Sequence, residues 1–154
     1  MEEIKITQLT KDKFDEAVKL VLDADLDTKE EIEHHLEHIE AHYIATINGK
    51  IIGVIGWYQD NVNYATDAMG DKFPGPEVYW VGFFAVGKNY RNRGIGTRLL
   101  NKLESVIREK DAQEIWVSSV PETKDYYEKH GFKFVSTGEI NSNPKFFLKK
   151  TIFT

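Results

Sequence analysis

The chain has 154 residues, 41% of them hydrophobic, so it is long enough to bury a core, and it has no cysteine from which a disulfide could form. The missing cysteine also excludes a cysteine nucleophile and a thiolate zinc site. A net charge of −5 argues against nonspecific nucleic-acid binding, which depends on a basic surface. No apolar run approaches the ~20 residues of a membrane span, and no N-terminal signal pattern is visible. We therefore expect one cytoplasmic domain over residues 1–154, without a membrane or nucleic-acid partner.

The first part of the chain carries clear signals for helices and a hairpin. Thr28 followed by Glu31 is a capping-box signature, which predicts the start of a helix. Asn48-Gly49 between two apolar runs predicts a two-residue hairpin turn. The elements expected here are a strand over 3–9, helices over 11–23 and 29–41, and strands over 43–47 and 50–58.

The second part begins with residues 59–77, whose glycines and prolines and lack of periodicity predict a long loop. A near-continuous apolar strand follows, and Gly82 inside it predicts a bulge or the close approach of another backbone or a ligand. The elements expected after the loop are a strand over 78–86, a helix from 95 to about 110, a strand over 114–118, a short helix over 121–130, and strands over 132–136 and 145–152.

The most informative motif is Arg91-Asn92-Arg93-Gly94-Ile95-Gly96, which joins the apolar strand to an amphipathic helix. Two glycines allow a tight turn, so that backbone N–H groups and the positive end of the helix converge on one anion. The motif is not a dinucleotide fingerprint, because Leu99 stands where a third glycine is needed, and it lacks the Gly-Lys-Ser/Thr of a P-loop. It indicates a pyrophosphate site, with a plain turn before a helix as the alternative.

The order of elements, with Arg-x-x-Gly-x-Gly after the fourth strand, resembles the GNAT superfamily of acyl-CoA-dependent N-acetyltransferases over essentially the whole chain. A second signature is the segment from Tyr126 to Phe132, which is similar to the Phe-Tyr-x-x-x-Gly-Phe ending of many members. The resemblance implies an α/β (α+β) GNAT-like fold. Its central mixed sheet would have about seven strands, with strands four and five splayed, flanked by about four helices.

The resemblance also implies the reaction, in which an acetyl group passes from the cosubstrate acetyl-CoA to a primary amine of a small molecule or peptide. The transfer would occur by direct attack in a ternary complex, without a metal; a homodimer is left open. Tyr127 would donate to the departing sulfur. The residues implied to contact pantetheine are Phe84, Ala85 and Val86, and those implied to surround the pyrophosphate are Arg91, Asn92, Arg93, Gly94, Ile95, Gly96 and Thr97.

The chain departs from the family pattern at three positions. Val120 replaces an asparagine, Thr123 replaces an alanine, and Trp80 replaces a glutamate that some members use on strand four. These departures keep open the alternative of a non-catalytic acyl-CoA-binding module. They also leave the general base open, with Glu77, Asp60, Asp67, His34 and His38 as candidates.

Two further patterns have alternative interpretations. His34, His38 and His42 are spaced by four, which suits a zinc site, although a polar helix face is the simpler interpretation and we expect no metal. Aromatic residues of the strands and loop would line the acceptor pocket or the core. They are Trp57, Tyr58, Tyr64, Phe73 and Trp80.

Overall fold

The structure is a computed structural model that describes residues 3–59 and 64–152. Within these ranges it contains eight strands and five α-helices, which confirms the expected mixed α/β class. The chain divides into two compact units. The first comprises Met1–Trp57 and Gly82–Ser105, and the second comprises Tyr58–Val81 and Val106–Thr154.

The first unit contains an antiparallel sheet in which β1 (Ile4–Gln8) pairs with β2 (His42–Ile47) and β2 pairs with β3 (Lys50–Tyr58). The predicted hairpin turn is confirmed, because Asn48 and Gly49 both have positive φ, 51° and 80°, and Ile47 pairs with Lys50. Lys13 stabilises this turn, because its Nζ donates to the Gly49 carbonyl at 2.6 Å.

The first two helices begin near their predicted starts, but both differ in detail. A short 3-10 turn (Lys11–Lys13) precedes α1 (Phe14–Asp23). Thr28 caps α2 (Lys29–Leu36) by accepting from the Glu31 amide at 3.3 Å, as predicted. The predicted end of α2 at residue 41 is wrong, because His38 leaves the helical conformation, with ψ at 68°, and a separate 3-10 turn (Ile39–Ala41) follows.

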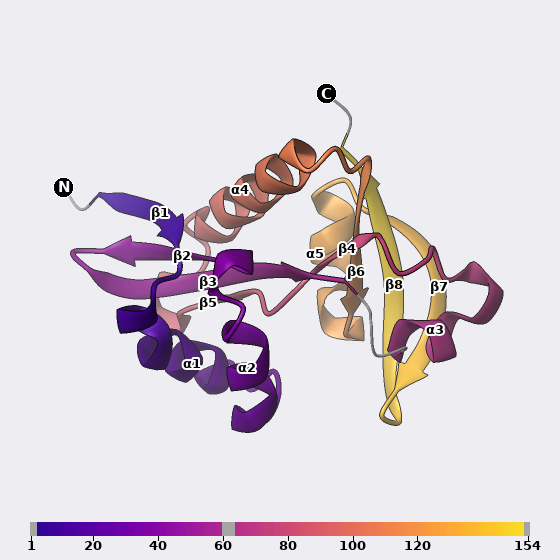
Figure 1. Ribbon diagram of the computed structural model, residues 1–154, viewed down its shortest axis with the longest axis horizontal. Helices are drawn as coiled ribbons and strands as arrows, with labels where there is room; N and C mark the ends of the chain where they lie inside the picture. Colours follow the sequence, from indigo (N-terminus) through magenta and orange to yellow (C-terminus); the bar gives the residue numbers. More distant parts are fainter. Residues whose placement is uncertain (1–2, 60–63, 153–154) are drawn as a thin grey trace. The chain divides into compact units, whose positions relative to one another are not determined.

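Helices cover both faces of the first unit's sheet (Figure 1). α1 and α2 pack against one face in a core that includes Val18, Leu36 and Val54. The N-terminal part of α4 (Ile95–Glu109) lies on the opposite face, where Gly53 of β3 leaves room for it. A Cβ on Gly53 would lie 2.8 Å from the Leu99 methyl group. The buried apolar side chains of α4 form a stripe, as expected of an amphipathic helix, and are Ile95, Leu99, Leu100, Leu103 and Ile107.

The predicted strand over 78–86 is in fact two strands, β4 (Tyr79–Val81) and β5 (Ala85–Val86). The break occurs at Gly82, whose amide donates to the Gly56 carbonyl at 2.6 Å. A Cβ on Gly82 would lie 3.2 Å from that carbonyl, so the close backbone approach predicted for this glycine is confirmed. β5 then pairs antiparallel with β3.

The second unit contains a mixed sheet in the order β4, β6 (Glu114–Ser119), β8 (Asn143–Thr151) and β7 (Lys133–Ile140). The β4–β6 pair is parallel, and the others are antiparallel. β7 and β8 extend beyond their predicted ranges because Asn141 and Ser142, with φ of 52° and 67°, form a second two-residue hairpin turn.

The long loop predicted over residues 59–77 is only partly a loop, because α3 (Tyr64–Met69) and a 3-10 turn (Gly70–Lys72) lie within it. α3 covers one face of the second unit's sheet, where Ala65 and Met69 pack with Trp80 and Phe147 (Figure 1). These tertiary contacts stabilise a helix that is too short to be recognised from periodicity.

The predicted helix over 121–130 begins as a 3-10 turn (Pro121–Thr123) and continues as α5 (Lys124–Lys129). Its end is a Schellman motif, in which the Phe132 amide donates to the Tyr127 carbonyl and the Gly131 amide to that of Glu128. Gly131 has a φ of 93°, which suits glycine at this position. No helix within residues 3–59 and 64–152 is long and apolar enough to cross a membrane.

Candidate functional site

The loop before α4 has the backbone geometry of an anion site. Asn92 and Gly94 both have positive φ, 63° and 77°, and the Gly94 carbonyl accepts from the Arg98 amide at 3.1 Å. The amides of residues 95–97 precede this first helical bond, at the positive end of the helix dipole. Ile95 is buried while residues 91–94 are exposed, so the helix is anchored and the loop is open to solvent.

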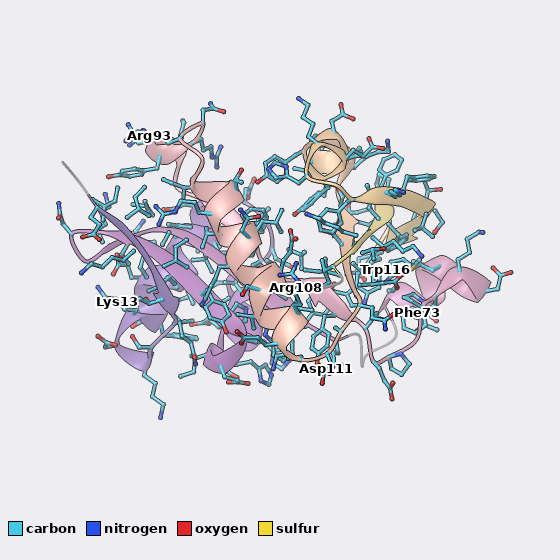
Figure 2. The ribbon with its side chains drawn as sticks, turned by 90° about the horizontal axis from the view of Figure 1, so that it is seen from above. Lys13, Phe73, Arg93, Arg108, Asp111 and Trp116 are labelled. Carbon is cyan, nitrogen blue, oxygen red and sulfur yellow. The ribbon has the colours of Figure 1, made fainter. Side chains whose placement is uncertain are left out.

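Cationic side chains surround this loop. Arg91 is held by its Nε, which donates to the Val86 carbonyl at 3.1 Å. The Tyr90 ring lies 5.4 Å from the Arg93 guanidinium and 5.7 Å from Lys50 Nζ. Figure 2 shows Arg93 at the N-terminal end of α4. The backbone donors and the positive charge are therefore gathered in one short segment, as an anion site requires.

The residues expected to contact pantetheine lie directly before that loop. Ala85 pairs with Val54 and Val86 with Gly53, so these two residues form a strand with one edge on β3, and Phe84 directly precedes it. Gly87 continues the connection by donating to the Ile52 carbonyl at 2.7 Å. The structure thus brings the ten residues expected to bind the cofactor into one continuous stretch of the first unit.

Two histidines line the segment around the strand break. The His35 ring packs edge-on against Phe83, with centroids 5.1 Å apart and planes at 80°. The His42 ring covers Gly56, where a Cβ would collide with it. Because His42 Nδ1 lies 2.9 Å from the His38 carbonyl, which only accepts, Nδ1 carries the hydrogen. Burial lowers the pKa of both imidazoles, to about 4 for His42.

Tyr127 lies in the second unit, on α5, and its side chain is buried. Its ring packs edge-on against Phe132 and Tyr126, with centroids 5.4 and 5.5 Å away. Desolvation by burial, followed by the neighbouring Tyr126 and Tyr58, raises the pKa of the Tyr127 hydroxyl above its ordinary value. The hydroxyl is therefore protonated at neutral pH and has a hydrogen that it can donate.

The turn into α5 is built from residues that differ from the family pattern. Ser119 is buried, and its hydroxyl donates to the Val120 carbonyl at 2.7 Å and lies 2.8 Å from the Thr123 hydroxyl. The Thr123 amide donates to the same carbonyl at 3.1 Å. Hydroxyl groups thus fix the corner where many relatives have an asparagine and an alanine.

The other predicted candidates have less distinctive surroundings. Glu77, Asp67, His34 and His38 are exposed, and Asp60 lies outside the described residues. Trp80 is 1% exposed and packs with Trp116 in the second unit's core, which Tyr58 and Phe73 border. Trp57 is the last residue of the first of the two segments that make up the first unit, and Tyr64 is the first residue of α3. In the part of the chain that the structure describes, no group of three histidine or acidic side chains is placed to hold a metal.

Sequence reasoning missed two features of this region. His35 lies one residue from the predicted candidate His34, but its contact with Phe83 joins segments 48 residues apart and leaves no local pattern. Lys50 follows the Asn48-Gly49 turn, and the antiparallel pairing of β3 with β5 brings it to Tyr90. The turn signal predicted that Lys50 begins a strand, but only the pairing of β3 with β5 shows that Lys50 lies near Tyr90.

The protein is of the mixed α/β class, with a loop of anion-site geometry before a helix, and comparison with known sequences identifies its family. The sequence profile of the Acetyltransferase (GNAT) family matches residues 5–132. The chain therefore belongs to the GNAT acetyltransferase family.

Known relatives agree with this assignment. The chain is similar to an uncharacterized N-acetyltransferase of Chlorobaculum tepidum, with 25% identity over 105 residues, 68% of this chain. The match spans 57% of that protein, so the chain corresponds to less than two thirds of it.

Solved structures share the fold. An N-acetylglutamate synthase from Neisseria gonorrhoeae, complexed with coenzyme A and N-acetyl-glutamate, has a TM-score of 0.78 at 17% identity and covers 99% of this chain and 36% of its own. The NatC complex bound to Gag peptide and CoA has a TM-score of 0.73 at 24% identity, covering 97% of this chain and 98% of the other.

Proposed function

We propose that the chain acts as a single N-acetyltransferase domain that transfers an acetyl group from acetyl-CoA to a primary amine of a small molecule or peptide. The observation that carries this proposal is the loop from Arg91 to Thr97, where two positive-φ residues turn the backbone into the N-terminus of α4. This arrangement suits the pyrophosphate of CoA, because N–H groups and the helix dipole favour the same anion.

The direction of the bound cofactor follows from the order of these residues. With the pyrophosphate on residues 91–97, an extended pantetheine arm runs back along Val86, Ala85 and Phe84, on the edge of β5 away from β3. Main-chain hydrogen bonds hold it as they hold an added strand. The thioester then lies at the Phe84 end, next to the strand break at Gly82.

The acceptor class is supported by the structural relatives. One relative is an N-acetylglutamate synthase complexed with coenzyme A and N-acetyl-glutamate, and the other is the NatC complex bound to a peptide and CoA. The fold thus accommodates amines of both small molecules and peptides. For this chain we propose only that the acceptor is a primary amine.

We propose direct attack in a ternary complex, as the resemblance to the family implies; the absence of a cysteine that could carry an acyl intermediate agrees with it. The amine lone pair forms a bond to the thioester carbon, and the tetrahedral intermediate then breaks its C–S bond. A thiol of pKa near ~8.5 is a modest leaving group, so a hydrogen-bond donor assists its departure. We assign that role to Tyr127, whose raised pKa keeps its hydroxyl protonated.

The test is thiol release from acetyl-CoA across a panel of small amines and peptide N-termini, together with the dissociation constant for CoA. An N-acetyltransferase binds CoA and releases thiol with at least one class of amine, and mass spectrometry finds an acetylated product. CoA binding without turnover on the whole panel would favour the non-catalytic acyl-CoA-binding module. Absence of CoA binding would contradict both.

A further inference from the structure

We infer that His35 is the general base that takes the proton from the attacking amine. This inference rests on the proposed function, and it assigns a role to a residue that lies in none of the family's motifs. His35 lies on α2, in the same unit as the expected cofactor-binding segment.

The position of His35 follows from its contact with the strand break. Its ring lies 5.1 Å from that of Phe83, the residue directly before the pantetheine segment that starts at Phe84. The thioester end of the cofactor lies at this end of the segment, because the pyrophosphate occupies the other end. His35 is therefore the imidazole beside the reacting carbon, and its half-exposed ring remains accessible to an acceptor.

The protonation state of His35 suits a base. Burial lowers its pKa below the usual value of 6.5, so the ring is neutral at neutral pH and one nitrogen has a lone pair. Glu31 and Asp27 act in the opposite direction and raise the pKa, whereas the neighbouring His34 and His38 lower it further. His35 in turn contributes to lowering the pKa of His42, the first residue of β2.

In the proposed step, the amine lone pair forms the N–C bond to the thioester carbon, and the C=O pair moves onto oxygen. Bonding makes the nitrogen far more acidic than a free ammonium, so its proton passes to the neutral nitrogen of His35. The oxygen pair then reforms C=O, the C–S pair leaves with sulfur, and sulfur takes a proton from a donor. His35 then releases its proton to water and the donor regains one from water, so the products are the amide and free CoA, and both residues return to their starting states.

Other candidate bases fit less well. His34 on α2 and His38 just after its end are exposed, and their rings contact each other, with centroids 6.4 Å apart. The His42 ring is 2% exposed over Gly56, so an acceptor has little access to it. Of the histidines described in the first unit, His35 alone combines partial exposure with a ring contact to Phe83.

Two substitutions separate chemistry from packing. His35→Phe keeps an aromatic ring against Phe83 but has no basic nitrogen. His35→Gln keeps a polar side chain but loses both the aromatic ring and the basic nitrogen. Both variants should bind acetyl-CoA with unchanged affinity and should lose kcat by about 10²-fold or more, the usual contribution of a general base. Glu37→Gln, an exposed change at the end of the same helix, is the matched control and should retain full activity.

The pH profile gives a readout that packing does not move. Below the pKa of His35, kcat/KM of the wild type should fall more steeply with acid than that of His35→Phe, because an additional proton blocks the base. Added imidazole should partly restore His35→Gln. An active wild type with a fully active His35→Phe overturns the assignment, as does a larger loss in His34→Gln. A wild type inactive on every amine overturns the proposed function and this inference together.

Discussion

At the scale of single residues, the groups proposed to hold the ligand differ in their surroundings from the groups proposed to move protons. Gly94 and Asn92 shape the loop through their backbone, and Arg91 is fixed by the Val86 carbonyl. Tyr127 and His35 instead have pKa values shifted by burial in opposite senses, up for the phenol and down for the imidazole. Each shift favours the neutral form, so one group is a donor and the other an acceptor at the same pH.

The first prediction concerns Tyr127→Phe. Only the hydroxyl is lost, so the edge-on packing against Phe132 is retained and the protein should fold and bind acetyl-CoA normally. The value of kcat should fall at least about tenfold, since general acids contribute ~10²–10⁴-fold. Steady-state kinetics measure this loss.

Tyr126→Phe is the control for the neighbouring ring, which contacts His130 with centroids 4.2 Å apart. It should lose less activity than Tyr127→Phe. The reverse order would mean that the motif is aligned one residue out of register, and equal full activity would leave both tyrosines with a packing role alone.

The second prediction concerns Gly94→Ala. Gly94 has a φ of 77°, and an alanine there costs about 1–2 kcal/mol or shifts the backbone, although a Cβ meets no atom within 4 Å. A shifted loop no longer aims its amides at one anion, so the affinity for CoA should fall severalfold or more. Isothermal titration with CoA measures it.

Gly70→Ala provides a matched control. Gly70 also has a positive φ, 60°, and open space around its Cβ position, but it lies outside the anion loop. The two variants should lose similar stability, whereas only Gly94→Ala should weaken CoA binding. Equal CoA affinities for both folded variants would remove the loop from the binding site.

At the scale of elements, local signals predicted what local interactions determine. The Thr28 cap of α2, the Asn48-Gly49 turn and the apolar stripe of α4 are all present, although the Thr28 amide donates to Asp27 and not to Glu31 as in a full capping box. The sequence did not predict α3, because its six residues are too few to show a helical period, are followed by a segment rich in glycine and proline, and are stabilised by the sheet. At Gly82 the sequence predicted a bulge or a close approach, but not that the strand divides there or that Gly56 is the partner, since Gly56 is remote in sequence.

The third prediction tests how α3 is held. A Cβ on Gly138 of β7 would lie 2.5 Å from the Ala68 carbonyl oxygen, a backbone atom that cannot rotate away. Gly138→Ala should therefore push α3 off the sheet and destabilise the protein by about 1–3 kcal/mol, the usual cost of overpacking. Chemical denaturation measures the free energy of unfolding.

Thr137→Ala, an exposed change at the preceding position of β7, should alter stability by only about 0.5 kcal/mol or less. If Gly138→Ala were equally mild, α3 would adjust to the added methyl group, and its contact with β7 would not determine its position.

At the scale of the whole molecule, buried histidine links folding to pH. His42 is 2% exposed, and burial lowers its pKa from 6.5 to about 4. Between these values the unfolded chain binds a proton that the folded chain does not. The contribution of neutral His42 to the free energy of unfolding is therefore fully present above about pH 6.5 and is lost as the pH falls towards 4.

The fourth prediction follows from this difference. The free energy of unfolding should decrease by up to about 3 kcal/mol as the pH falls from 7 to 4 on account of His42, in addition to the effects of carboxylates. In His42→Gln the decrease between pH 7 and 5 should be clearly smaller, which denaturation at several pH values measures. Parallel curves for the two proteins would assign the acid sensitivity to other groups.

The end of α5 also bears on how such chains diverge. Gly131 and Phe132 close the Schellman motif, and the Phe132 ring packs on that of Tyr127. Folding alone therefore selects an aromatic residue, three intervening positions, a glycine and a second aromatic residue. A descendant that had abandoned acetyl transfer would keep this spacing with phenylalanine in place of Tyr127. On the role proposed for Tyr127, one phenolic oxygen is thus a better marker of catalysis in surveys of related genomes than the motif that surrounds it.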